Sequence, residues 1–346
     1  MSSSIARAIP AAEGGFPSEG ANPWTLARRR LQRNRPALVM LVVLVMIVVA
    51  CLAAPLYATH VAHTNPFTSN LDGTTVVNGK TVPVMKQEEG GLGLGVTPIG
   101  PTWDPRHYML GADNQGRDVA ARVLYGGRNS LLIAVAAAFV TCVLATVIGL
   151  ISGFFGGVTD GVLSRLLDVI WAFPVYLLAI CLSTVLLTQG ISVGPLRIEA
   201  GSLWLPVLII GLVFVPYVAR PVRGEVLSLR EREFVEAAIG LGASNWRLLR
   251  SDILPNVITT VIVFFPLMIA INMLTEAALS FLSIGVQPPD ASWGTIILDG
   301  QGLLYTRPAV ALAPGIAIAI TVLALNVLGD GVRDALDPRA KLRRAG

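Results

Sequence analysis

The chain has 346 residues, of which 53% are hydrophobic and only 14% are charged. A soluble globular domain carries about 25% charged residues, so the composition excludes an ordinary soluble domain. The net charge of +4 is mild, and arginines lie at the ends of apolar runs instead of forming the basic face that a nucleic-acid partner requires. The apolar runs have about the 20 residues needed to cross a bilayer. They predict an integral membrane protein with no nucleic-acid partner.

Residues 1–36 are polar, rich in Gly, Pro and Ser, and end in an arginine cluster. This composition predicts a disordered tail that becomes a basic collar against membrane lipid. The apolar segment 37–57 is predicted to be the first transmembrane helix. Because positive charge precedes it, the tail is expected in the cytoplasm.

Residues 58–130 are predicted to form a long extracytoplasmic loop. Within it, Thr74–Val82 predicts a β-hairpin, because Asn78-Gly79 favours a type I′ turn and β-branched residues flank it. Residues 117–130 are expected to form a helix that leads into the membrane. The insertion at 59–106 either touches a substrate-binding protein or forms a passive cap, and the hairpin favours a small ordered cap.

Residues 131–328 are predicted to be the transmembrane core. Five further apolar runs predict helices at residues 131–155, 169–188, 203–218, 257–284 and 309–328. Prolines within four of these runs predict kinked helices, which are tolerated where neighbouring groups satisfy the freed carbonyls. Six crossings return residues 329–346 to the cytoplasm. The predicted fold is all-α and transmembrane, with six helices and an extracytoplasmic loop that contains a small β-hairpin.

Two features of the core are candidates for the pathway or for helix packing. One is a stripe of small residues that recur every four positions and let another helix approach closely: Ala145, Gly149, Gly153 and Gly157. The other is Glu276, a carboxylate well inside the predicted helix 257–284 that has to face protein or water. It either lines a pathway or pairs with a partner subunit, or it only fixes helix packing, and the packing interpretation is preferred. Four charged residues are predicted at the membrane interface: Asp160, Asp168, Arg220 and Arg223.

The longest predicted cytoplasmic loop, residues 220–256, is expected to form two short amphipathic helices. The first ends at Gly242, which can adopt a left-handed conformation. The second is capped by Ser244 or Asn245 and stops at Pro255. The predicted apolar faces consist of Phe234, Ala237, Ala238 and Leu241, then Trp246, Leu249 and Ile253. Such a hairpin either enters a groove of a partner protein or lies at the headgroup boundary, and these patterns leave both interpretations open.

The same segment resembles the EAA loop of ABC importer permeases, with Glu236-Ala237-Ala238, three residues, Gly242, and then Ile253-Leu254-Pro255. In that family the loop is a coupling helix that docks into a cleft of an ATP-hydrolysing subunit. Asp252 departs from the pattern, because relatives often carry a basic residue or His near that position. The resemblance implies an ATPase-coupling role for Glu236, Ala237, Ala238, Gly242, Trp246, Ile253, Leu254 and Pro255.

Three further stretches resemble permeases of dipeptide and oligopeptide importers of the DppC/OppC type: Leu110–Val119, Leu279–Pro289 and Leu325–Arg339. The resemblance implies a type I, MetI-like fold in the bacterial cytoplasmic membrane that works by alternating access. The implied partners are a second permease of the DppB/OppB type, two ATPase subunits that hold ATP and Mg, and an extracytoplasmic substrate-binding protein. The implied cargo is di- or oligopeptides, with glutathione or a nickel chelate as alternatives.

No catalytic, metal or cofactor site is predicted in the chain itself. Gly79-Lys80-Thr81 is similar to the end of a Walker A motif, but the required first glycine position holds Thr74, so other chains are expected to hydrolyse ATP. His60 and His63 lack the further ligands of a metal site. A stand-alone channel or secondary carrier leaves segment 236–255 unexplained. An intramembrane enzyme needs a nucleophile–base or metal cluster, and the predicted helices show none.

Overall fold

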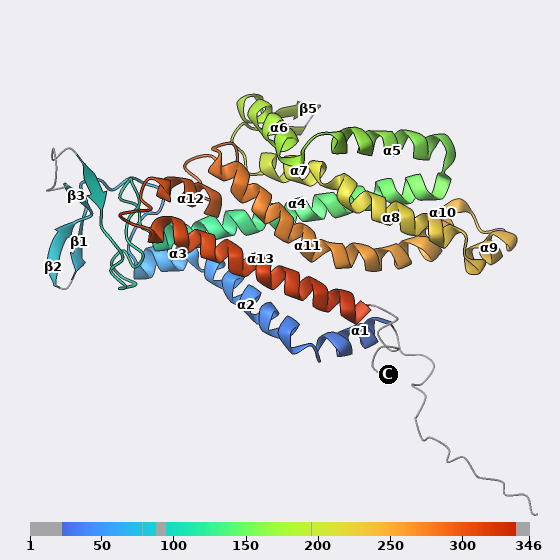
Figure 1. Cartoon of the computed structure of the whole chain (residues 1–346), viewed down its shortest axis with the longest axis horizontal. Coiled ribbons are helices and arrows are strands. Elements are labelled where there is room, and N and C mark those ends of the chain that lie inside the picture. The colour runs from blue at the N-terminus through green and yellow to red at the C-terminus, as the bar shows by residue number, and fades with distance from the viewer. Residues whose placement is uncertain (1–22, 78, 88–94, 195, 337–346) are drawn as a thin grey trace, which may run out of the picture.

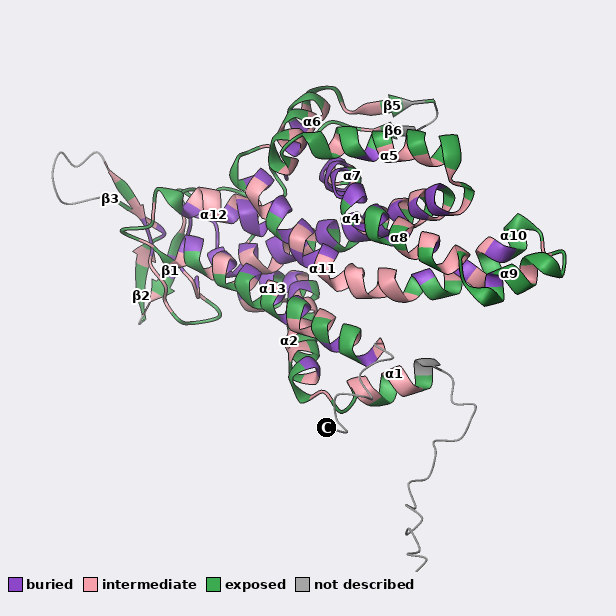
Figure 2. Cartoon of the chain, turned by 45° about the vertical axis from the view of Figure 1, so that its right-hand side comes forward, coloured by how far each residue is buried: buried purple, intermediate pink, exposed green. Residues whose placement is uncertain are grey.

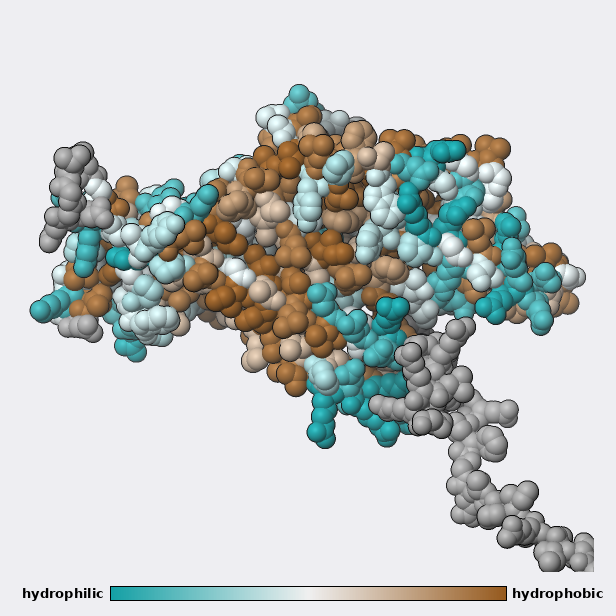
Figure 3. Space-filling model, viewed as in Figure 1, coloured by the Kyte–Doolittle hydropathy of each residue, from teal (hydrophilic) through white to brown (hydrophobic). Residues whose placement is uncertain are grey.

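The computed structural model describes residues 23–77, 79–87, 95–194 and 196–336. Figure 1 shows an elongated bundle of helices with a strand-containing cap at one end and a helical hairpin at the other. Hydrophobic surface gathers over the middle of the bundle, and hydrophilic surface is concentrated toward the ends (Figure 3). This distribution is typical of a membrane-spanning protein. Parts of the predicted tails 1–36 and 329–346, namely residues 1–22 and 337–346, lie outside the described residues, as does Asn78 of the predicted turn.

The chain enters the bundle through a short helix, α1 (Pro23–Leu31), and a long apolar helix, α2 (Arg35–Leu52). The Asn34 side chain caps α2 by accepting a hydrogen bond from a backbone N–H of its first turn at 3.2 Å. Only 11% of the apolar window of α2 is buried, so this helix lies at the edge of the bundle. A short helix, α3 (Ala54–Leu56), and a π-helical turn, η1 (Tyr57–Val61), continue the chain toward the cap.

The cap, defined as the described residues between Ala62 and Asp118, contains two small antiparallel strand pairs. These are β1 (Thr74–Val77) with β2 (Lys80–Pro83), and β3 (Met85–Gln87) with β4 (Val96–Pro98). The first pair confirms the predicted hairpin. The second pair was not predicted, because its strands have only three residues each and show no alternating pattern. A cluster of buried apolar residues inside the cap consists of Val84, Ile99, Tyr108 and Ala112.

Three long helices form the centre of the bundle: α4 (Val119–Phe155), α11 (Leu254–Phe281) and α13 (Ala309–Leu336). The short helix α12 (Trp293–Gln301) packs against both α11 and α13. The α4 helix has 37 residues, which corresponds to about 55 Å at a rise of 1.5 Å per residue. It therefore extends beyond the hydrocarbon layer, and the predicted helix 117–130 and span 131–155 form one continuous helix.

The predicted span at 169–188, expected to be one helix kinked at its proline, is broken into two helices. The chain instead forms α5 (Gly157–Ala172) and α6 (Val175–Gln189), which are bent by 88° relative to each other. Phe173 between them has an extended backbone, with φ −92° and ψ 140°, as the residue before a proline prefers. Pro174 also lacks the N–H that a continuing helix needs. The two residues therefore end one helix and start the next in a new direction.

The predicted helix 203–218 is also divided, into α7 (Trp204–Val213) and α8 (Val215–Arg230), with a bend of 43°. Two strands, β5 (Ile191–Val193) and β6 (Leu196–Ile198), pair between α6 and α7. Among the described residues, four continuous helices are long and apolar enough to cross a membrane, and six spans result when each bent pair counts as one. The predicted all-α transmembrane fold with small strand pairs is confirmed in this form.

The stripe of small residues on α4 lies against α8. A Cβ added to Gly149 would lie 2.5 Å from Val222 Cγ1, and one added to Gly153 would lie 2.8 Å from Val226 Cβ. The two helices therefore approach more closely than a larger side chain would permit. The predicted fourth member, Gly157, is not part of the stripe, because α4 has ended before it and open space surrounds it.

Candidate functional site

The candidate coupling segment forms a helical hairpin at the end of the bundle opposite the cap (Figure 1). The α8 helix leads into α9 (Glu233–Gly240), and a loop connects α9 to α10 (Asn245–Arg247). A π-helical segment, η2 (Leu248–Ile253), continues directly into α11. We call residues 231–253 the hairpin. Its two ends are therefore joined to two helices of the bundle.

The first half of the hairpin ends at the predicted glycine. Gly242 has a φ of +83°, and no heavy atom lies within 4 Å of a Cβ built on it. The backbone conformation, and not a shortage of space, therefore requires glycine. The N–H groups of Leu241 and Gly242 donate to the carbonyls of Ala237 and Ile239 at 3.0 and 2.9 Å. These bonds satisfy the last carbonyls of α9 and set the direction in which the chain returns.

The second half of the hairpin differs from its prediction. Ser244, and not Asn245, caps α10, and its Oγ accepts a hydrogen bond from the Arg247 N–H at 3.4 Å. The prediction that Pro255 stops this helix is wrong, because the chain stays helical through η2 and Pro255 lies in the first turn of α11. The π-helical segment shifts the hydrogen-bond register just before a residue that lacks an N–H. The hairpin is thus joined to α11 without a flexible break.

Large apolar side chains project from the hairpin into solvent. The exposed fractions are 46% for Phe234, 89% for Leu241 and 71% for Trp246, and Figure 2 shows α9 and α10 largely exposed. Exposed apolar surface that gathers in one place indicates an interaction site. The buried side chains of the hairpin are Val235, Leu248 and Ile253.

The residues of the predicted coupling motif fall into two groups. Glu236, Ala237, Gly242, Trp246 and Pro255 are exposed, whereas Ala238 and Leu254 are half-buried and Ile253 is buried. The first part of the motif therefore faces outward. The second part holds the hairpin against the bundle.

Glu276 lies in a buried hydrogen-bond network between α4, α11 and α12. Its carboxylate accepts hydrogen bonds from Ser130 Oγ at 2.8 Å and from Ser280 Oγ at 2.7 Å. The two hydroxyl oxygens accept hydrogen bonds in turn, from the Trp293 N–H at 3.1 Å and the Val286 N–H at 3.0 Å. Both carboxylate oxygens are thus satisfied inside the protein, as burial at membrane depth requires. The network therefore ties α4, α11 and α12 together around Glu276.

A buried charge cluster that the sequence did not indicate joins the cap to the bundle. Arg117 Nη2 and Arg122 Nη2 donate to Asp299 Oδ2 on α12 at 2.9 and 2.8 Å, and Arg117 Nε donates to Asp113 Oδ2 at 2.7 Å. Burial raises the pKa of the Asp299 carboxyl above its ordinary value, and the Arg122 and Arg117 guanidiniums oppose that rise. The cluster consists of ion pairs. Within the described ranges, no group of three or more His, Cys, Asp and Glu is placed to hold a metal ion.

Two family models match this chain. The model of the binding-protein-dependent transport system inner membrane component matches residues 145–342, and that of the N-terminal TM domain of oligopeptide transport permease C matches residues 22–72. Because the first match covers more than half of the sequence, the chain belongs to the family of binding-protein-dependent transport system inner membrane components. The predicted resemblance to ABC importer permeases of the DppC/OppC type is confirmed.

Similar proteins are named as permeases of several transport systems. A putative peptide transport system permease protein of Brucella abortus is 35% identical, over 94% of this chain and 96% of its own length. The glutathione transport system permease protein GsiD of Pectobacterium atrosepticum is 37% identical, over 68% and 73%. The oligopeptide transport system permease protein OppC of Haemophilus influenzae is 34% identical, over 93% and 90%. The chain is therefore a membrane permease component of a transport system.

Proposed function

We propose that this chain forms half of the translocation pathway of an ATP-driven peptide importer, and that the hairpin couples it to an ATPase subunit. The observation that carries the proposal is the hairpin itself, where Leu241 and Trp246 are exposed on a segment joined directly to α8 and α11. A partner that covers these side chains removes apolar surface from water. A partner bound to the hairpin would therefore be connected to both α8 and α11.

A displacement of the hairpin would reach the bundle by two routes. Through α8 it acts on α4, because Gly149 and Gly153 bring those helices into close contact. Through η2 it acts on α11, which the Glu276 network ties to α4 and α12. Close-packed interfaces transmit such displacements as rigid-body shifts. In the proposed cycle, ATP-driven closure of the ATPase subunits draws the coupling hairpins together and opens the pathway outward, and hydrolysis resets it.

The proposed assembly contains two permeases, this chain and one of the DppB/OppB type, together with two ATPase subunits that hold ATP and Mg. A substrate-binding protein would deliver cargo on the side of the cap. Membership of the binding-protein-dependent family supports this assembly. The chain itself is proposed to bind no cofactor and to carry out no covalent chemistry.

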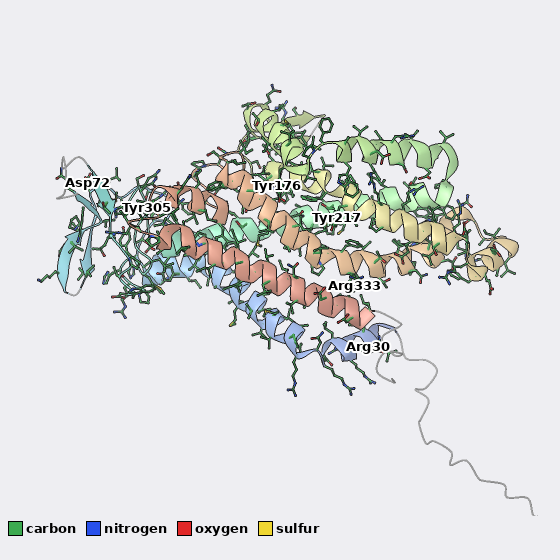
Figure 4. All side chains as sticks on the ribbon, in the orientation of Figure 1. Arg30, Asp72, Tyr176, Tyr217, Tyr305 and Arg333 are labelled. Atoms are coloured by element: carbon green, nitrogen blue, oxygen red, sulfur yellow. The ribbon has the colours of Figure 1, made fainter. Side chains whose placement is uncertain are left out.

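In the proposed orientation, the hairpin and both chain ends lie on the cytoplasmic side of the inner membrane. Figure 4 shows Arg30 and Arg333 at the end of the bundle away from Asp72 of the cap. Arg30 Nη1 donates to the Ala335 carbonyl at 3.4 Å, so α1 lies at the end of α13. Positive charge is concentrated on the cytoplasmic side of membrane proteins. Exposed arginines that support this orientation are Arg28, Arg29, Arg33 and Arg35.

The proposed cargo is a di- or oligopeptide. Relatives from Brucella abortus and Haemophilus influenzae, aligned over more than nine tenths of this chain, are named for peptide and oligopeptide transport. Glutathione is the second candidate, because the Pectobacterium atrosepticum relative is named for its transport.

The proposal is tested by placing a charge on the hairpin. Leu241→Glu introduces a carboxylate into a surface that we propose is desolvated by the ATPase, and burying an unpaired charge is strongly unfavourable. The ATPase subunit is therefore expected to be lost when the assembled importer is purified through a tag on this chain. The matched control is Leu71→Glu, which places the same charge on an exposed leucine of the cap and should leave co-purification unchanged. Retention of the ATPase by the Leu241→Glu variant would contradict the proposal.

A further inference from the structure

The α5 helix is attached to the bundle between two points where the backbone changes direction. Gly156 precedes it and Gly157 is its first residue, with φ values of +64° and +52°. It ends at Ala172, and α6, which begins after Phe173 and Pro174, is bent by 88° relative to it. A Cβ on Gly157 would meet no heavy atom within 4 Å, so conformation and not crowding requires glycine there. Both ends of α5 therefore have the geometry of hinges.

Apolar packing does little to hold α5 in place. Leu167 is the one buried residue of this helix, all of whose residues are described. Large apolar side chains on its remaining surface are exposed: Val158, Val162, Leu166, Val169 and Trp171. The α8 helix is packed more tightly than α5, because its Val222 and Val226 lie against the glycines of α4.

Two ion pairs connect α5 to α8 beside a cleft lined by Ser164, Leu167, Asp168, Arg220 and Arg223. Arg223 Nε and Nη2 donate to the two carboxylate oxygens of Asp160, both at 2.6 Å. Asp160 also accepts hydrogen bonds from Ser164 Oγ of α5 and from Ser152 Oγ of α4. The charged groups were predicted to lie separately at the membrane interface. The structure instead pairs them between two helices.

The second ion pair is more exposed. Arg220 Nη2 donates to Asp168 Oδ1 at 2.7 Å, and the Arg220 guanidinium lies 4.0 Å from the centre of the Trp171 ring. Its side chains are 43% and 50% exposed, against 32% and 19% for Arg223 and Asp160. Exposed pairs contribute little, whereas a bidentate arginine–carboxylate pair fixes both distance and direction. The Asp160–Arg223 pair is therefore the main attachment of α5 to α8.

The position of α8 gives this attachment a consequence for transport. The α8 helix ends at Arg230, and α9 of the hairpin begins at Glu233, so α8 is the first helix that a displaced hairpin would move. Because α5 has a hinge at each end and is held to α8 by a directional ion pair, it can pivot and still follow α8. An interdigitated apolar face would resist such pivoting.

We propose that Asp160 and Arg223 are positioning residues through which movement of the hairpin reaches α5. This inference rests on the coupling function proposed above. When α8 shifts, the bidentate pair pulls α5 with it, and the backbone yields at Gly156–Gly157 and at Phe173–Pro174. The Ser164 hydroxyl, which lies on α5 and moves with it, keeps the Asp160 carboxylate aimed at Arg223.

The test uses the assembled importer in nanodiscs with Cys181→Ser and spin labels on Val169→Cys, at the far end of α5 from Gly156–Gly157, and on Val45→Cys of α2, which lies at the edge of the bundle. Both label positions are exposed, and the distance between labels is compared without nucleotide and with ATP and vanadate. The parent is expected to show a nucleotide-dependent change of distance. Arg223→Gln should lose most of that change, and the charge exchange Asp160→Arg with Arg223→Asp should restore it. The matched control, Arg220→Gln, should retain it.

A second arm separates a link that transmits movement from a contact that only stabilises the resting state. Asp160→Cys and Arg223→Cys, joined by a short bis-methanethiosulfonate crosslinker, should preserve the nucleotide-dependent change, because α5 then follows α8 permanently. In this arm the two spin labels are attached through ketoximes to p-acetylphenylalanine at the label positions, so that the crosslinker meets only the thiols at 160 and 223. Loss of the change on crosslinking, or an unaltered change in Arg223→Gln, would overturn the proposal. A parent that retains its ATPase but shows no change of distance would also overturn the proposal, whereas the coupling function fails separately if the Leu241→Glu variant retains the ATPase. Co-purification of the ATPase with Arg223→Gln is expected throughout.

Discussion

The cap and the hairpin lie at opposite ends of the bundle and are attached to it differently. The cap is fixed by buried polar groups: Arg122 Nη1 donates to the Pro66 carbonyl at 3.1 Å, and Arg307 Nε donates to the Pro98 carbonyl at 2.6 Å. The hairpin is joined through the backbone to α8 and α11, and it leaves Leu241 and Trp246 in solvent. The cap is attached through charged side chains of this chain, whereas the hairpin presents apolar surface that an ATPase subunit can cover.

This difference separates a permanent part of the permease from a contact that is completed by another subunit. Charges that are buried and paired within one chain need no second protein to be stable. Exposed leucine and tryptophan side chains, in contrast, favour association, because covering them removes apolar surface from water. The comparison therefore predicts that substitutions in the cap cluster act on stability and that substitutions in the hairpin act on assembly.

The largest effect on stability is expected at Arg122. Arg122→Met removes a buried cation that pairs with Asp299, and breaking a buried pair in this way lowers the free energy of unfolding by about 3–5 kcal/mol. Denaturation of the purified protein in mixed micelles measures the change. The control is Arg220→Gln at the exposed pair with Asp168, for which about 1 kcal/mol or less is expected. Equal effects for the two variants would show that the cluster does not hold the cap.

A smaller effect is expected where α4 meets α8. Gly149→Ala places a Cβ 2.5 Å from Val222 Cγ1, and overpacking of this kind lowers the free energy of unfolding by about 1–3 kcal/mol. Gly161→Ala in α5 is the matched control, because nothing lies within 4 Å of its Cβ. Alanine also favours a helix over glycine by about 1 kcal/mol, so this control should be neutral or stabilising. If both variants were equally stable, the close approach of the two helices would not depend on glycine.

The smallest effect on stability is expected within the hairpin. Gly242→Ala forces a side chain into a left-handed conformation with φ +83°, at a cost of about 1–2 kcal/mol. Because the turn sets the direction of the chain after α9, binding of the purified ATPase should weaken more than overall stability falls. Gly240→Ala, at the last residue of α9 and also in open space, serves as the control. Unchanged ATPase affinity in Gly242→Ala would separate the turn from coupling.

Local patterns were sufficient to predict the hairpin, but they were not sufficient to predict the bends. Gly242 and the apolar positions of α9 lie within a few residues of each other, so sequence spacing alone indicates a turn. Prolines alone do not predict where a helix is divided. Pro266 and Pro314 lie inside continuous helices, whereas Pro174 separates α5 from α6. The packing of neighbouring helices decides whether a proline bends a helix or ends it, and this packing cannot be predicted from the residues around the proline.

Long-range pairs were also beyond the sequence. Arg122 and Asp299 are 177 residues apart, and Arg223 and Asp160 are 63 residues apart. Each of these charged residues, taken alone, is typical of the membrane interface or of a loop. Their partners become evident only when the fold brings the helices together. The hydrogen-bond partners of Glu276 could not be predicted for the same reason, because Ser130 is 146 residues away.

The most direct test of the central claim is the accessibility of the hairpin in the assembled importer. Trp246→Cys, in a background with Cys181→Ser, is labelled with a maleimide in the isolated chain and in the complex with its ATPase. The account predicts rapid labelling of the isolated chain and strong protection in the complex, whereas Leu71→Cys in the cap is labelled equally in both. Equal labelling of Trp246→Cys with and without the bound ATPase would contradict the proposal that this surface is the coupling site.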